Sequence, residues 1–189
     1  MKLFLLPLLF LFGGSIATPV PPTTKQPPKA QDTPTMVKEA WTSVGNAYKQ
    51  LEDAVKGIRP TKGGVTASYV PRAHENLMFT LQNTMNSVRG LKPVGIGEAA
   101  LGLTLPAYNL RSIEIQAITT IRNSKPIVVQ AGERETFRTA LVDQFAYHRL
   151  WSDTFKALVP TSPQQSFGQG FTDGVLDAYT KTIADYSFD

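Results

Sequence analysis

The fold is decided by residues 133–189, which read ERETFRTALVDQFAYHRLWSDTFKALVPTSPQQSFGQGFTDGVLDAYTKTIADYSFD. In the first half, mostly apolar and aromatic side chains recur at the three-, four- and seven-residue steps that bring side chains to one face of a helix. They are Phe137, Leu141, His148, Trp151, Phe155 and Leu158. A second stripe is made by Phe167, Phe171, Val175, Tyr179 and Tyr186. Each stripe predicts an amphipathic helix that must pack against other helices or another apolar surface.

The two helices are separated by proline. Pro160 ends the first, because proline cannot continue the hydrogen-bond ladder and restricts Val159 before it. Ser162-Pro163-Gln164-Gln165 restarts the chain with a capping residue, a proline suited to the first turn and a glutamine that can reach back.

Upstream, three more apolar stripes predict helices over residues 36–58, from about 69 to 89, and over 104–123. Residues 95–103 can add a helical turn, and Ile127-Val128-Val129 is interpreted as a lead-in to the helix that begins between Val129 and Arg134. Because the links are short, we expect an all-α bundle of about five mostly antiparallel helices. The row Gly170, Gly174 and Ala178 either lets another helix approach closely or only weakens a first turn.

The first 35 residues indicate export. Lys2, the apolar run 3–12, and the small residues Ser15 and Ala17 are typical of a signal peptide cleaved after Ala17. Residues 18–35 are rich in Pro and Thr and have little to bury, so they predict a disordered stalk that is either a plain linker or a carrier of O-glycans. We therefore expect a secreted protein, extracellular or in a cell wall, whose binding domain spans residues 36–189 and which has no transmembrane segment.

Composition argues against several classes of function. The chain has no cysteine. Its net charge is only +4, and its basic residues are evenly mixed with acidic ones, so we expect no nucleic-acid partner. No nucleophile elbow, phosphate loop or dinucleotide motif is present. The pair His74-Glu75 lacks the second histidine of a metalloprotease helix, and His74 is interpreted as a solvated residue at a helix start. We therefore expect no enzyme, no cofactor and no metal.

The domain resembles the secreted fungal family named for hydrophobic surface-binding protein A, which includes cell-wall galactomannoproteins. The resemblance spans about Met36–Ser187, and it is carried by the order of four features. They are the stripe ending at Ile58, the Ile121…Lys125-Pro126…Gly132 step, the helix running into Val159-Pro160, and the closing Tyr179…Ile183-Ala184-Asp185-Tyr186-Ser187. The resemblance implies a helical bundle that adsorbs to hydrophobic surfaces and recruits polyester-degrading hydrolases. Some members capture fatty acids in an apolar tunnel.

Three functions remain open on the sequence. The first is non-enzymatic binding of a hydrophobic surface, a fatty acid or another lipid; the others are a structural cell-wall mannoprotein and a secreted effector that binds a protein partner. A cavity of about 300 Å³ or more, lined by the stripes, would favour lipid capture. The cavity candidates are Trp41, Tyr48, Phe137, Leu141, Gln144, His148, Trp151, Phe155, Phe171, Val175 and Tyr179.

Within this set, Gln144 and His148 lie four residues apart on one helical face. They are either a polar pair that anchors a lipid head group or a core pair satisfied by each other or by the backbone. Three large apolar residues fall off the stripes. If they join one exposed patch, they are candidates for adsorption to a surface; they are Phe79, Ile115 and Leu150.

Overall fold

A computed structural model describes residues 32–61, 64–65, 69–159 and 167–187, without the side chains of residues 60, 61, 64, 65, 69 and 167–171. Its five long helices are α1 (Thr33–Lys56), α2 (Tyr69–Val88), α4 (Thr104–Asn123), α6 (Arg134–Leu158) and α7 (Phe167–Ser187). The short helices are α3 (Ile96–Gly102) and α5 (Lys125–Gln130), and β1 (Pro60–Thr61) pairs antiparallel with β2 (Gly64–Val65). The all-α prediction is confirmed, but the described residues form seven helices rather than about five. None of these helices is both long and apolar enough to cross a membrane.

The first helix begins earlier than predicted. The side chain of Asp32 accepts a hydrogen bond of 2.9 Å from the backbone N–H of Thr35, and Pro34 occupies the first turn. A capping carboxylate and an early proline both stabilise a helix start. Residues 33–35 therefore belong to α1, which corrects the predicted stalk boundary at Thr35. The signal peptide, residues 18–31 and the predicted restart at Ser162–Gln165 lie outside the described residues.

The two short helices flank α4. The predicted extra turn forms as α3, and the Ile127–Val129 segment is helical within α5. At the end of α5, Gly132 adopts a φ of 75°, a left-handed conformation that glycine accepts at little cost. The N–H of Glu133 then donates to the carbonyl of Val128 over 3.1 Å, which closes this helix end before α6 begins.

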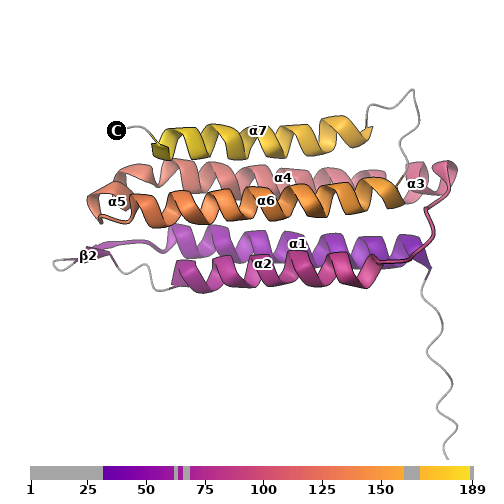
Figure 1. The fold of residues 1–189 in the computed structure, drawn as a ribbon, viewed down its shortest axis with the longest axis horizontal. Coiled ribbons are helices and arrows are strands. Elements are labelled where there is room, and N and C mark those ends of the chain that lie inside the picture. The colour runs from indigo at the N-terminus through magenta and orange to yellow at the C-terminus, as the bar shows by residue number, and fades with distance from the viewer. Residues whose placement is uncertain (1–31, 62–63, 66–68, 160–166, 188–189) are drawn as a thin grey trace, which may run out of the picture. The chain divides into compact units, whose positions relative to one another are not determined.

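The five long helices form a closed ring around one core. Helix α1 packs on α2 and α4, α7 packs on α4 and α6, and α2 packs on α6. Figure 1 shows that α1, α4 and α7 run in one direction and that α2 and α6 run in the other. Three of the five contacts around the ring therefore join parallel helices. The prediction of mostly antiparallel neighbours was wrong because it considered only helices consecutive in the chain.

Within the row of small residues on α7, Gly174 serves a different purpose from the one predicted. A Cβ added at Gly174 would lie 2.5 Å from a terminal guanidine nitrogen of Arg111 in α4. The missing side chain at Gly174 thus makes room for an arginine side chain rather than for the backbone of a neighbouring helix. Gly170 lies among the residues whose side-chain surroundings are not described.

Two phenylalanines offer a direct test of the assigned helix faces. Phe155 is buried, with 4% of its surface exposed, and its ring lies 4.5 Å from that of Trp151; Phe79 is 63% exposed. Phe155→Ala should lower the free energy of unfolding by about 3–5 kcal/mol, because it removes core contacts and leaves a cavity. The matched change Phe79→Ala should stay within about 0.5 kcal/mol of the unchanged protein. Chemical denaturation measures both, and equal effects would contradict the assigned faces.

Candidate functional site

A chain of hydrogen-bonded side chains crosses the core of the ring. The phenol oxygen of Tyr48 in α1 lies 3.2 Å from Nδ1 of His148 in α6 and 2.8 Å from the phenol oxygen of Tyr179 in α7. Tyr179 donates to Oε1 of Gln144 over 3.3 Å, and Nε2 of Gln144 lies 2.9 Å from Nδ1 of His74 in α2. Four of the five ring helices are therefore connected through polar side chains.

Counting protons gives this chain a direction. The amide nitrogen of Gln144 can only donate, so Nδ1 of His74 accepts and a neutral His74 carries its proton on Nε2. Tyr179 uses its one proton on Gln144, so Tyr48 donates to Tyr179. Tyr48 must then accept from Nδ1–H of His148, which leaves Nε2 of His148 as a lone-pair acceptor. Nε2 has no hydrogen-bond partner among the described residues.

Glu114 adds a residue of α4, the fifth helix of the ring, to this group of buried polar side chains. Its side chain is fully buried, and its Oε1 lies 3.6 Å from Nδ1 of His148. Neither carboxyl oxygen has a hydrogen-bond partner in the described part of the chain. Burial raises the pKa of Glu114 well above 4.5 and, with a contribution from Lys156, lowers the pKa of His148 to about 3. Although the distance would permit an ion pair, desolvation of both groups favours a neutral acid beside a neutral imidazole.

Glu52 of α1 shows what a satisfied buried carboxylate looks like in this protein. Lys56 approaches it to 2.6 Å, and Gln116 and Thr120 donate to the same oxygen over 2.9 and 3.1 Å. Burial would raise the pKa of Glu52, but these donors hold it below its ordinary value. The different surroundings explain why the pKa of Glu52 is lowered and that of Glu114 is raised.

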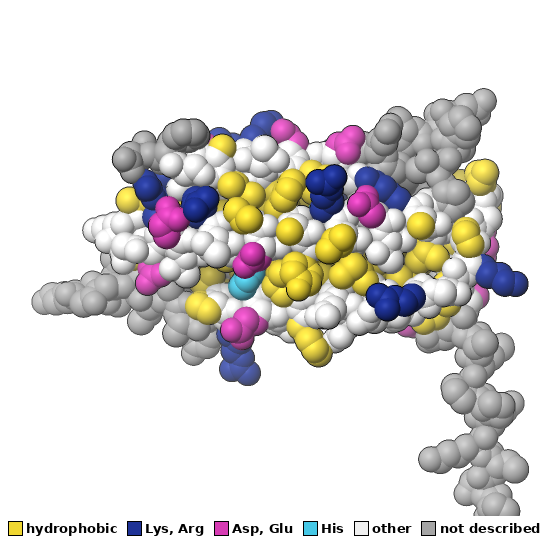
Figure 2. All heavy atoms as spheres, viewed as in Figure 1, with side chains coloured by type: hydrophobic (Ala, Val, Ile, Leu, Met, Phe, Trp, Pro, Cys, Tyr) yellow, Lys and Arg dark blue, Asp and Glu magenta, His cyan; other side chains and the backbone are white. Residues whose placement is uncertain are grey.

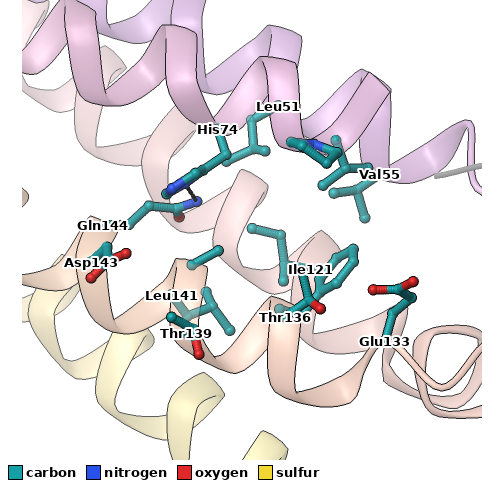
Figure 3. A pocket seen from close by; sticks show the side chains of 14 residues that line it. Leu51, Val55, His74, Ile121, Glu133, Thr136, Thr139, Leu141, Asp143 and Gln144 are labelled. Atoms are coloured by element: carbon teal, nitrogen blue, oxygen red, sulfur yellow. Dashed lines mark hydrogen bonds between the residues drawn. The ribbon is translucent and has the colours of Figure 1, made fainter. Parts of the chain in front are cut away.

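A pocket with a cavity volume of about 440 Å³ opens at the end of the bundle where α2 and α6 begin. Figure 3 shows the side chains of His74, Gln144 and Asp143 at one end of it and that of Glu133 at the other. Between them the wall is largely apolar. It is formed by Leu51, Val55, Val70, Pro71, Ile121, Phe137, Ala140 and Leu141, with Thr136 and Thr139. Leu51, Ile121 and Leu141 are buried, whereas Pro71, Thr136 and Thr139 are exposed, so the mouth lies between α2 and α6.

The polar chain ends at this pocket. Gln144 is 2% exposed and is held at both ends of its amide, by Tyr179 in the core and by His74 at the mouth. Burial lowers the pKa of His74, while the charges of Asp143 and Glu75 oppose that shift. A neutral His74 is what the donated hydrogen bond from Gln144 requires.

The structure divides the sequence-predicted cavity residues into two groups. Phe137, Leu141 and Gln144 line the pocket. Seven others are buried in the core and do not line it: Trp41, Tyr48, His148, Trp151, Phe155, Val175 and Tyr179. The side chain of Phe171 lies outside the described residues. Gln144 and His148 are joined through Tyr48 and Tyr179, which lie between them in the line of hydrogen bonds, and not directly to each other. Their role in ligand binding stays a prediction.

The three surface candidates also differ. Phe79 and Leu150 are 63% and 59% exposed, but Ile115 is half-buried and packs against the core. Ile115 lies off the predicted stripe of its helix, yet α4 contacts both α1 and α7 and so buries a broader face than one stripe. Its expected exposure is thereby corrected.

Three residues of the site were missed by sequence reasoning. His74 was interpreted as solvated, but it is half-buried and lines the pocket. Asp143 was not singled out. Glu114 follows Leu110 by four residues and precedes Ala117 by three, so its spacing alone placed it on the buried face of α4. No three side chains suited to hold a metal ion converge within the described residues.

Comparison with known proteins shows the fold. No family model matches the chain, and no curated protein matches it either. Ligand binding domain 1 of the Penicillium marneffei MP1 protein, complexed with arachidonic acids, superposes with a TM-score of 0.74 and 18% identity, covering 82% of this chain and 99% of that domain. Ligand binding domain 2 of the same protein, complexed with multiple arachidonic acids, gives a TM-score of 0.72 and 18% identity, covering 85% and 100%.

AFMP4P in complex with palmitic acid gives a TM-score of 0.71 and 13% identity, covering 82% of this chain and 99% of its own. All three are structures of complexes with fatty acids. At such identities the likeness shows a shared fold. Membership of the hydrophobic surface-binding protein A family stays a prediction from the sequence.

The neutral state of Glu114 predicts a stabilising substitution. Burial raises the pKa of this carboxyl well above its ordinary value of 4.5, so the fold favours the protonated form, and stability is lost as the pH rises above the pKa of the unfolded carboxyl. Glu114→Gln keeps the shape without that loss, so it should raise the free energy of unfolding at pH 7. The gain should shrink as the pH falls toward 4.5, because the unfolded carboxyl is then protonated as well. Denaturation curves across this range measure the effect, and a large loss at pH 7 would instead indicate a buried ion pair.

Proposed function

We propose that this protein binds lipids without catalysis, holding an apolar chain in the pocket between α2 and α6. The observation that carries the proposal is the 440 Å³ cavity with its largely apolar wall. Ligand pockets in proteins fall mostly between about 300 and 1,000 Å³ and combine an apolar wall with a few polar groups. The polar groups here are the side chains of His74, Gln144, Asp143 and Glu133, together with two threonine hydroxyls.

The size and the walls of the pocket also support lipid binding. An acyl chain gains roughly 0.8 kcal/mol for each methylene group that leaves water, so a cavity of this size can repay the cost of binding. The wall combines residues of four helices, and the buried ones, such as Leu51 and Ile121, belong to the folded core. The pocket is therefore largely formed before the ligand arrives. The similar structures are complexes with arachidonic acids and with palmitic acid, which agrees with an apolar ligand.

Filling the pocket tests this function. Ala140 lines the cavity, so Ala140→Phe should occupy part of it and weaken the binding of both dodecanol and dodecanoic acid by about tenfold or more. Equilibrium dialysis with labelled ligands measures the change. Ala146 lies on the same helix and is exposed, and Ala146→Phe should leave binding unchanged. If the Ala140→Phe variant is folded by circular dichroism and binds both ligands as well as the unchanged protein does, the ligand binds outside this pocket.

Adsorption to a hydrophobic surface is a second candidate function. It is favoured by large apolar side chains on the outside of the bundle: Phe79, Leu150, Leu101 and Leu105 are each at least 59% exposed. Figure 2 shows that hydrophobic side chains reach the surface at many points of one face. Such exposure also occurs in proteins without this function, so the candidate depends on its own experiment.

For this second function, Phe79→Ser and Leu150→Ser together should reduce adsorption to hydrophobic beads by severalfold. Their exposure means that the thermal midpoint should change little. Ile115→Ser is the contrasting variant, because it removes a half-buried contact and should lower the midpoint. Unchanged adsorption by the double variant would exclude these two residues as the contact.

Two further parts of the proposal rest on the sequence. Secretion rests on the signal-peptide pattern of residues 2–17. Recruitment of a secreted polyester hydrolase rests on the family resemblance alone, and pull-down of the purified domain with such a hydrolase would test it.

A further inference from the structure

We propose that the lipid held in this pocket ends in an uncharged hydroxyl group, bound at the end formed by His74, Gln144 and Asp143, and that a free carboxylate is disfavoured there. The inference rests on the proposed function and specifies its ligand class. It would set this protein apart from the proteins of the same fold whose structures are complexes with fatty acids.

The charged side chains that line the pocket are acidic. Its described lining includes two carboxylates, Asp143 and Glu133, and neither lysine nor arginine. A third carboxylate, Glu75, acts on His74 together with Asp143. An anionic head group would therefore meet charges of its own sign at the mouth.

The polar groups at this end of the pocket can hydrogen-bond a hydroxyl group in both directions. Nδ1 of His74 is occupied by the amide of Gln144, so the remaining donor of a neutral His74 is the Nε2–H. Asp143, immediately beside Gln144 in the chain, supplies acceptors. A hydroxyl oxygen can accept from Nε2–H of His74 while its proton is donated to the carboxylate of Asp143. A carboxylate can do only the first of these, and an alkane neither.

The polar groups are placed where one end of a single lipid chain can reach them. His74, Gln144 and Asp143 lie together at one end of the pocket, and the apolar wall extends from them toward Glu133 (Figure 3). A single alkyl chain can thus lie along Leu141, Phe137 and Val55 with its hydroxyl at the other three. Glu133 lies at the opposite end and does not take part in holding the head group.

Two ligands of equal chain length separate head-group choice from lipid capture. Binding of dodecanol and dodecanoic acid to the purified domain is measured by equilibrium dialysis at about pH 8 and low salt, where the acid is ionised. Dodecanol should bind about fivefold or more tightly than dodecanoate, and the difference should shrink in high salt, because salt screens charges. Equal or tighter binding of dodecanoate overturns the inference and leaves lipid capture intact. Failure of both ligands to bind removes the proposed function itself.

Substitutions locate the effect. Asp143→Asn removes the nearby charge, so it should tighten dodecanoate binding by about threefold or more and weaken or leave unchanged the binding of dodecanol. Glu133→Gln should have a smaller effect on the ratio of the two affinities, because it lies at the far end. Asp153→Asn, the same exchange on an exposed part of α6 outside this pocket, should leave the ratio unchanged. A larger change in the ratio from Glu133→Gln than from Asp143→Asn would overturn the placement of the head group.

Discussion

The rest of the structure depends on a line of hydrogen bonds through a core that is largely apolar. His148, Tyr48, Tyr179, Gln144 and His74 are connected in sequence, and each hydroxyl or amide is used in a fixed direction. Buried polar groups are costly unless they are paired, so this line can form only when four helices take up one relative register. Apolar stripes alone tolerate sliding and rotation, and the polar line restricts both.

The same line connects the core to the pocket. Gln144 belongs to the core through Tyr179 and to the mouth through His74, so this amide at the polar end of the pocket is held in place from the core. Helices α2 and α6 touch at this bond and again where Nε1 of Trp151 donates to Thr84 over 3.0 Å. Toward the start of both helices no comparable bond joins them among the described residues, and there the pocket opens.

Glu114 is the exception to this order, since it lies at the centre without a hydrogen-bond partner in the described chain. Its burial keeps it neutral, which is compatible with the neutral His148 beside it. The carboxyl groups of Asp143 and Glu133 line the pocket instead. This acidic lining, rather than the fold, bears on which head group is accepted.

The sequence by itself determined the five long helices and most of the residues on their buried faces. The stripe periodicity, Pro160 and the short links predicted the all-α class, and α4 has the bounds that its stripe and early proline indicated, because such signals act within one turn of helix. The order of helices around the ring was decided only by tertiary packing, which set α1 beside α4 and α2 beside α6. That packing also brought His74 to Gln144, seventy residues away in the chain. No local pattern encodes such a meeting, because it depends on how whole helix faces fit together.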